Sequence, residues 1–334
     1  MNQRSFIMEK SIEDWICEYM LYCRSKNLRP KTMCSYEQTL HLFKRWLEET
    51  EKITDIGKVT EAIIRRYIVD LQQRGKYTTC VSDFSKAQNR PERRRDYRTQ
   101  ISDVTINNYI RNLRAFFNWL DFEGALSKNP MKKIRQIKTE RRAKEYLTDE
   151  EFYKLCKSLD LSYFAEHRDH AIINLLLDTG MRLGECLSLK IDDLDTAHRA
   201  IRLKEENTKG RHSRNVFFSK KMDVLLRKWL RYKDRYCESV YLFPKHDGTQ
   251  INISSFEANF RKYLRRSGIS KEISPHALRN NFAKRCLMAG MDIYTLSRIL
   301  GHSSVTVTEK AYLDLTDDDI RLRYQHFSPI ENLR

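Results

Sequence analysis

The chain has 334 residues, of which 40% are hydrophobic, enough for two domains with buried cores. Its 62 lysines and arginines against 45 acidic residues give a formal charge of +17, which is too basic for most enzymes of small metabolites and favours a polyanion, nucleic acid first, as partner. No apolar run approaches the roughly eighteen residues of a membrane span, and the N-terminus has no signal-peptide core, so we expect a cytoplasmic protein.

Four amphipathic helices are predicted in residues 1–130. The first carries apolar side chains at spacings of three and four from Ile12 to Cys23, the second follows Pro30 and the third follows Thr60. The fourth has the clearest apolar stripe, from Ile106 to Leu120. Together they predict a small helical bundle.

A polar, basic insertion separates the third and fourth helices, at about residues 76–102. It includes Arg93, Arg94, Arg95 and Arg98. One interpretation is a long mobile segment that orders on DNA, and the other is a solvated basic loop without a specific role. Residues 131–146 then lose the helical period and contain seven basic side chains, which predicts an interdomain linker.

Residues 147–334 are expected to form a second domain of mixed structure. It opens with the capping-box spacing of Thr148 to Glu151, and a helix over 167–180 ends at Gly180 with another directly behind it. Two short β-forming segments, 198–204 and 214–218, flank a turn and predict a hairpin with Lys209 in or beside the turn. Helices are predicted over 254–268, 274–290, 292–301 and 304–315, so the class is mainly α with a small β-hairpin.

His276 and Arg279 are candidates for a phosphate site. Ser274 suits the N-cap and Pro275 the first helical position, which places both residues in the first turn of a helix and on one face. Free N–H groups and the helix dipole attract an anion there, and an imidazole and a guanidinium strengthen the attraction. The plainer alternative is a histidine packed near a helix start beside a surface arginine.

Three further residues could belong to the same site, but their roles depend on the surrounding motifs. Arg182 follows a glycine helix stop between apolar neighbours, so partial burial would require an anionic partner, either Glu185 or a ligand phosphate. His302 follows Gly301, and Tyr312 lies ten residues later on a helix where a tyrosine is ordinarily part of the core.

The order G-x-R-x-x-E, a hairpin lysine, H-x-x-R, L-G-H and a later tyrosine resembles the tyrosine recombinase, or phage integrase, family over most of the chain. The resemblance implies an N-terminal four-helix core-binding, SAM-like domain and a tyrosine recombinase catalytic domain. It carries six catalytic positions over to Arg182, Lys209, His276, Arg279, His302 and Tyr312. Two departures are "LRNNFA" where many members read "LRHTFA", outside the six positions, and the basic insertion; Lys204 and Arg211 also flank the hairpin turn.

The same resemblance implies a mechanism. Tyr312 attacks a DNA phosphate held by Arg182 and Arg279 and forms a 3′-phosphotyrosyl bond, without metal, ATP or another cofactor. His276 is implied as the acid/base and His302 as a donor to the phosphate. Lys209 is implied as the group that protonates the departing 5′ hydroxyl.

The expected biological role is site-specific recombination for a mobile element, by integration, excision or transposition. A chromosome- or plasmid-dimer resolvase of the same family is the first alternative. A type IB topoisomerase, a telomere resolvase and a catalytically silent DNA-binding regulator are further ones. A metal hydrolase is disfavoured because His167 and His170 lack the H-E-x-x-H spacing, and the eight scattered cysteines predict mostly buried, reduced thiols with neither zinc nor disulfides.

Partners follow from the same interpretation. Double-stranded DNA with paired sites is the expected substrate, in a homotetramer that forms through a C-terminal helix near residues 316–327, although this helix could instead pack on its own domain. An accessory DNA-bending or directionality protein and a place at the bacterial nucleoid are also expected. The predicted DNA contacts, each with solvated surface as the alternative, are Lys31, Lys44, Arg45, Arg111, Arg114, Arg141 and Arg142.

Overall fold

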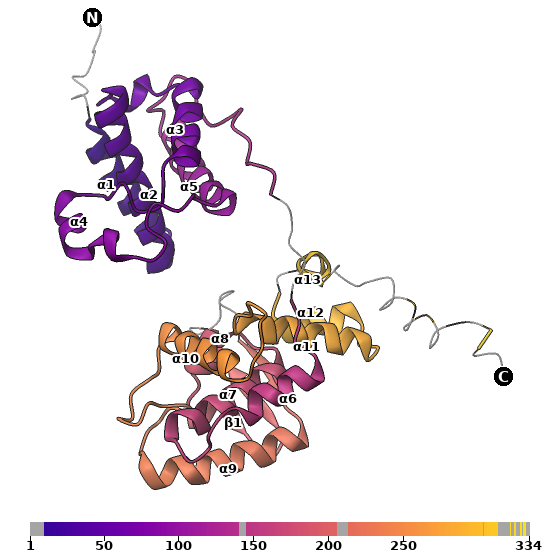
Figure 1. Ribbon diagram of the computed structural model, residues 1–334. Coiled ribbons are helices and arrows are strands. Elements are labelled where there is room, and N and C mark those ends of the chain that lie inside the picture. The colour runs from indigo at the N-terminus through magenta and orange to yellow at the C-terminus, as the bar shows by residue number, and fades with distance from the viewer. Residues whose placement is uncertain are drawn as a thin grey trace, which may run out of the picture. The chain divides into compact units, whose positions relative to one another are not determined.

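The computed structural model describes residues 10–139, 145–205, 213–302 and 304–312, together with residues 321, 324, 328, 330 and 331. The chain divides into two compact units, Met1–Arg141 and Arg142–Arg334, which are coloured from indigo to magenta and from magenta to yellow in Figure 1. None of the described helices has the length and apolarity that crossing a membrane requires.

The first unit contains the four predicted helices, α1 (Ile12–Ser25), α2 (Pro30–Trp46), α3 (Glu61–Gln73) and α5 (Asp103–Phe122). Side chains of Ser11, Thr60 and Ser102 accept hydrogen bonds from backbone N–H groups in the first turns of α1, α3 and α5 and so fix where these helices begin. A π-helix (Leu47–Glu51) and a 3₁₀ turn (Ile56–Lys58) join α2 to α3. The apolar stripes meet in a core that contains Tyr19, Phe43, Tyr67, Phe116 and Phe117.

The basic insertion has more regular structure than its sequence predicts. It contains α4 (Asp83–Asn89) and a 3₁₀ turn (Pro91–Arg93), and an antiparallel bridge between Gly75 and Gln100 closes its base. A Cβ atom at Gly75 would lie 2.5 Å from the Cα of Arg98, so the close approach of the two segments requires glycine. Arg45 also fastens the insertion, because its guanidinium donates to the Cys80 carbonyl and to Asp83.

The predicted linker begins too early. Met131 and Ile134 are buried in the core of the first unit, and the backbone N–H of Ile137 donates to the Asn107 side chain, which returns a bond to the Ile137 carbonyl. These contacts place residues 131–137 in the first unit. A short apolar segment without helical periodicity can still pack on a helical bundle. The loss of periodicity after residue 130 therefore did not mark the end of the first unit.

The second unit has eight helices among its described residues, α6 (Asp149–Lys157), α7 (Phe164–Thr179), α8 (Leu183–Leu187), α9 (Lys220–Tyr236), α10 (Ile253–Arg266), α11 (His276–Met288), α12 (Ile293–Leu300) and α13 (Val305–Tyr312). The predicted capping box is present, because Thr148 and Glu151 each bond to the other's backbone N–H. Helix α9 was missed, although Met222, Leu226 and Trp229 recur at helical spacing and are buried.

The sheet consists of β1 (Leu194–Asp195), β2 (Ala200–Leu203) and β3 (Arg214–Phe217), in that order and antiparallel. Strands β2 and β3 are the predicted hairpin, with Ile201 opposite Val216 and Leu203 opposite Arg214. The third strand, β1, was not predicted and has only two residues.

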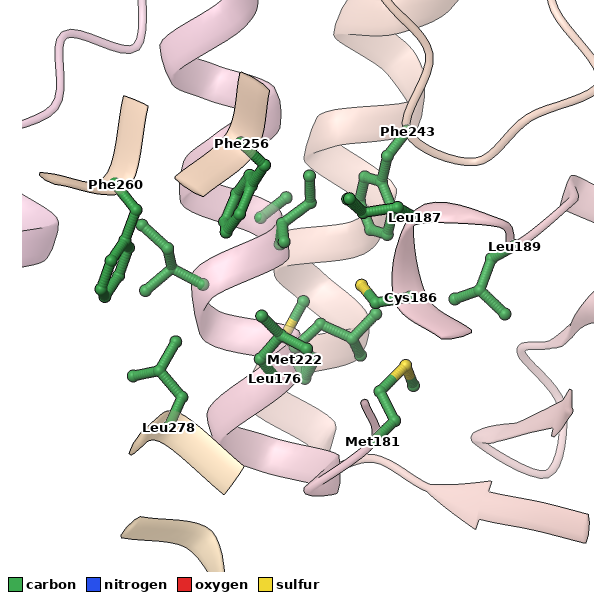
Figure 2. Close-up of a cluster of buried hydrophobic side chains, with 14 of the residues drawn as sticks. Leu176, Met181, Cys186, Leu187, Leu189, Met222, Phe243, Phe256, Phe260 and Leu278 are labelled. Atoms are coloured by element: carbon green, nitrogen blue, oxygen red, sulfur yellow. The ribbon is translucent and has the colours of Figure 1, made fainter. Parts of the chain in front are cut away.

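Helix α7 lies at the centre of the second core. Ala171, Ile172, Ile173, Leu175 and Leu176 are all buried, so the helix is covered on every side. Figure 2 shows side chains from several helices gathered in this core, among them Leu176, Met222, Phe256 and Leu278. The surrounding helices therefore place their ends with fixed separations, and three of these ends carry the candidate site.

All eight cysteines are free thiols, and the expectation that most are buried holds only in part. Cys23, Cys186 and Cys237 are buried, whereas Cys17 and Cys34 are exposed.

Candidate active site

Two helix C-termini are brought to the site by glycines in the left-handed conformation. Gly180 ends α7 with a φ of 64° and Gly301 ends α12 with a φ of 65°. A Cβ atom at Gly180 would lie 2.2 Å from the Phe282 ring, and one at Gly301 would lie 2.8 Å from the Nε of Arg214. Both the backbone conformation and the packing therefore favour glycine; Arg182 lies two residues after Gly180, and His302 directly follows Gly301.

Arg279 is buried beneath the surface, with 2% of its area exposed. Its Nη1 donates to the Gly180 carbonyl at 2.7 Å, and its Nη2 donates to the Leu300 carbonyl at 2.8 Å. Carbonyl groups at helix C-termini carry partial negative charge, so both ends stabilise the guanidinium. The alternative of a surface arginine at this position is wrong.

His276 and Arg279 do not share an exposed face. Helix α11 is assigned from His276, and Pro275 before it makes no side-chain cap bond. Pro275 has helical dihedral angles, which agrees with its predicted place at the first helical position. His276 is exposed at the start of the helix, and Arg279 lies underneath.

Arg182 precedes α8, and a quarter of its side chain is exposed. Its Nη1 donates to Glu185 Oε1 and its backbone N–H to Glu185 Oε2, both at 2.9 Å. The Arg182–Glu185 pair that the sequence left open is thus present. Because the carboxylate contacts one edge of the guanidinium, it orients the group and leaves part of it exposed.

His302 is half-buried next to Arg279. Its Nε2 lies 3.0 Å from Arg279 Nη2, and its Nδ1 lies 2.7 Å from Thr308 Oγ1. A guanidinium only donates, so Nε2 accepts, and Nδ1 carries the proton and donates to Thr308. Burial and the charges of Arg279, Arg182, Arg214 and His276 lower the pKa of His302 to about 4, which keeps the ring neutral at pH 7.

Tyr312 is the last residue of α13, which packs against α11 and α12, but its side chain lies outside the described residues. Lys209 and Arg211 lie outside them as well, as do Arg141, Arg142 and nearly all of the predicted tail helix. Lys204, the other candidate at the hairpin, forms an ion pair with Asp193 at 2.9 Å.

Sequence reasoning missed Arg214, the first residue of β3. Its Nη1 and Nη2 donate to the two oxygens of Glu185 at 3.1 and 2.7 Å, and its Nε donates to the Ile299 carbonyl at 3.1 Å. Burial raises the pKa of Glu185, but the bonds and charges of Arg214 and Arg182 outweigh it and lower that pKa below the ordinary range. The only signal in the sequence is an arginine at a strand end, which does not reveal its partner.

We call Arg182, Glu185, Arg214, Arg279 and His302 the arginine cluster. It combines three guanidinium groups with one carboxylate, and such an excess of rigid N–H donors suits a phosphate oxygen pair. Among the residues that the structure describes, no group of three histidine, cysteine or acidic side chains could hold a metal ion.

Several predicted DNA contacts of the first unit have protein partners instead. Lys44 bonds to Glu13 at 2.7 Å, and Arg114 donates to the Ile134 carbonyl at 2.7 Å. Arg45 bonds to Glu49, as well as to the insertion. Lys31 is exposed, and Arg111 contacts Asn108 within its own helix.

Two family models match the chain. The phage integrase family covers residues 145–319, and the N-terminal SAM-like domain of phage integrases covers residues 16–86. Tyrosine recombinase XerD of Listeria monocytogenes serovar 1/2a is 27% identical over 328 residues, 96% of this chain and 99% of the relative. Tyrosine recombinase XerC of Oceanobacillus iheyensis is 26% identical over 325 residues, 96% of each chain.

A likeness in fold extends over the whole chain. The solved structure of XerH site-specific recombinase, bound to a palindromic difH substrate in a post-cleavage complex, aligns with a TM-score of 0.70 at 17% identity. The alignment covers 99% of this chain and 100% of that one. The expected class, mainly α with a small sheet behind an N-terminal SAM-like domain, is confirmed.

Proposed function

Because the chain belongs to the phage integrase family, whose tyrosine recombinases cleave and rejoin DNA through a phosphotyrosine intermediate, we propose that it exchanges strands between two short DNA sites with Tyr312 as nucleophile. The observation that carries the proposal is the meeting of Arg182, Arg279 and His302 at three helix ends. Double-stranded DNA with paired sites is the proposed substrate and partner.

The arginines act on the scissile phosphate. Guanidinium N–H groups of Arg182 and Arg279 neutralise the charge that develops on the non-bridging oxygens as the phosphorus becomes five-coordinate. A free tyrosine has a pKa near 10, so the same positive field lowers the cost of forming the phenolate. The Tyr312 Oη–P bond forms while the P–O5′ bond breaks, and the 5′ oxygen leaves. The new ester retains the energy of the broken one, so no ATP is consumed.

Proton transfers are assigned to the remaining positions. His276, exposed at the start of α11, takes the Tyr312 proton, and Lys209 protonates the departing 5′ oxygen. His302 accepts from Arg279, so it donates to the phosphate only after the phosphate takes over that Arg279 N–H group. The phosphate charge also opposes the lowered pKa of His302 and favours its protonated form. In the second half of the reaction a 5′ hydroxyl of the partner duplex attacks, and Tyr312 recovers its proton.

The relatives favour chromosome- or plasmid-dimer resolution over the mobile-element role. Tyrosine recombinases XerD and XerC match nearly the full length of the chain, each with 96% of it covered. A plasmid that carries two directly repeated sites tests strand exchange: resolution into two circles supports a site-specific recombinase. Relaxation of any supercoiled plasmid, without exchange, would instead support a topoisomerase.

Substitution of Tyr312 tests the chemistry. Tyr312→Phe should bind the DNA site and form no covalent adduct on a nicked substrate, because it has no phenolic oxygen. The matched control is Tyr294→Phe, which removes an exposed phenol of α12 and should leave adduct formation unchanged. Adducts that persist in Tyr312→Phe, seen as slow bands in denaturing gels, would remove Tyr312 from the role.

The wider DNA contacts and the assembly are also proposals. Lys31 and Arg111 on the first unit, with Arg141 and Arg142 at the boundary of the two units along the sequence, are the better candidates for phosphate contacts, because Lys44, Arg45 and Arg114 already bond to protein groups. A homotetramer through residues 316–327 would bring two DNA sites together, and deletion from Thr316 onward should abolish assembly on DNA. The accessory protein stays a prediction.

A further inference from the structure

The carboxylate of Glu185 lies between two arginines and is almost fully buried, with 2% exposed. Oε1 accepts from Arg182 Nη1 and Arg214 Nη1, and Oε2 accepts from the Arg182 backbone and Arg214 Nη2. Four donors therefore reach the two oxygens, which fills the sites that a carboxylate offers. The Arg214 contact is bidentate and fixes the plane of the carboxylate.

Arg214 joins this carboxylate to the turn at the end of α12. Its Nε donates to the Ile299 carbonyl, and its side chain lies directly against Gly301, where a methyl group would collide with it. All three of its nitrogens thus bond to protein atoms, and only 12% of its side chain is exposed. Arg214 is therefore held by protein groups, and none of its three nitrogens is without a protein partner when a substrate arrives.

The same turn supplies the rest of the site. The Leu300 carbonyl accepts from Arg279, the Gly301 carbonyl lies 3.4 Å from Arg182 Nη2, and His302 follows. A shift of this turn relative to Glu185 would change the separation of the two arginines that are proposed to hold the phosphate. Arg214 bonds to both the turn and Glu185, and unlike Arg182, which also contacts Glu185 and the Gly301 carbonyl, it is not itself one of these two arginines.

We propose that Arg214 is a positioning residue: by bonding to Glu185 and to the Ile299 carbonyl, it sets the separation of Arg182 and Arg279 for the scissile phosphate. The inference rests on the proposed function. Arg214 also begins β3, so this strand of the hairpin is fixed to the site at its first residue. Positioning matters because a misplacement of about 1 Å can cost on the order of a hundredfold in rate.

Arg214→Lys separates geometry from charge, because lysine keeps the charge and cannot make the bidentate contact. We expect adduct formation on pre-bound DNA to slow by about tenfold to a hundredfold, while the Kd for the DNA changes little. The control is Arg202→Lys, an exposed position on β2 of the same sheet, which should behave like the wild type. The double variant Arg214→Lys with Glu185→Gln should form adducts no more slowly than the slower of the two single variants, because both substitutions act on one contact.

Three outcomes would overturn the proposal. An unchanged cleavage rate would show that the bidentate contact is dispensable, and an equal loss of binding and cleavage would indicate that Arg214 contributes to DNA affinity and not to positioning. Loss of the cooperative unfolding transition in Arg214→Lys would make the residue a stabiliser of the fold. If the wild type forms adducts, Tyr312→Phe does not and Arg214→Lys cleaves normally, only the role of Arg214 is wrong and the proposed function stands.

Discussion

The two arginine-rich regions of this molecule differ in how their charges are held. In the arginine cluster, Arg279, Arg214 and Arg182 bond to backbone carbonyls or to Glu185; Arg279 is buried, and only 12% of the Arg214 side chain is exposed. In the basic insertion, Arg93 and Arg95 are exposed and form no ion pair with a described residue. Fixed, desolvated charges can stabilise a transition state without reorganisation, whereas solvated charges add affinity that salt screens. We therefore expect the cluster to control rate and the insertion to control binding.

The sharpest test of this difference is Arg279→Lys, which keeps the charge and removes the planar fork. Lysine cannot reach the Gly180 and Leu300 carbonyls and the phosphate together, so we expect cleavage to slow by about a hundredfold to a thousandfold. The cleavage rate is measured as the rate of adduct formation in a single turnover. Arg285→Lys, a partly exposed position on the same helix, is the control. A rate within threefold of the wild type would show that charge alone suffices.

The insertion should respond in the opposite way. Arg93→Gln with Arg95→Gln should weaken DNA binding on the order of tenfold and flatten the dependence of log Kd on log salt by up to about 1.8, at about 0.9 per phosphate contact. Cleavage of saturated DNA should stay the same. Lys228→Gln with Arg231→Gln, both exposed on α9, removes equal charge elsewhere. A salt slope that does not change with the first pair would favour the solvated loop.

The smallest effect expected is on the pH dependence of stability. Burial and neighbouring arginines lower the pKa of His302 from 6.5 to about 4, so the unfolded chain binds the proton more readily between these values. Stability should therefore be complete above pH 6.5 and fall as the pH drops towards 4. In His302→Gln the slope of the unfolding free energy against pH should be smaller, by up to the contribution of about one bound proton. A slope should remain, because burial also lowers the pKa of His170 to about 4. If urea unfolding gave the same pH dependence of stability for His302→Gln and the wild type, His302 would be as solvated as the arginines of the insertion.

The comparison also shows where interpretation of the sequence fails. The DNA-contact set was chosen because its members lie on polar helix faces, yet Lys44, Arg45 and Arg114 bond to groups 20 to 38 residues away along the chain. Periodicity tells which face of a helix is polar, but a polar face can serve an internal partner or a ligand equally well. The insertion was misjudged for the same reason, since Gly75 and Arg45 fix it through contacts outside its own sequence.

The sequence by itself determined most of the helices, several of their caps and stops, the hairpin, the family resemblance and the order of the site residues, because these depend on local spacing and on the conformational preferences of glycine and proline. Only the tertiary structure decided that Arg279 is buried, that His302 is a neutral acceptor and that Arg214 bonds to Glu185. Each of these states is set by atoms brought close by packing, such as the Gly180 carbonyl 99 residues before Arg279. Burial and hydrogen-bond partners, which govern charge and orientation, are properties of that packing and have no local pattern in the chain.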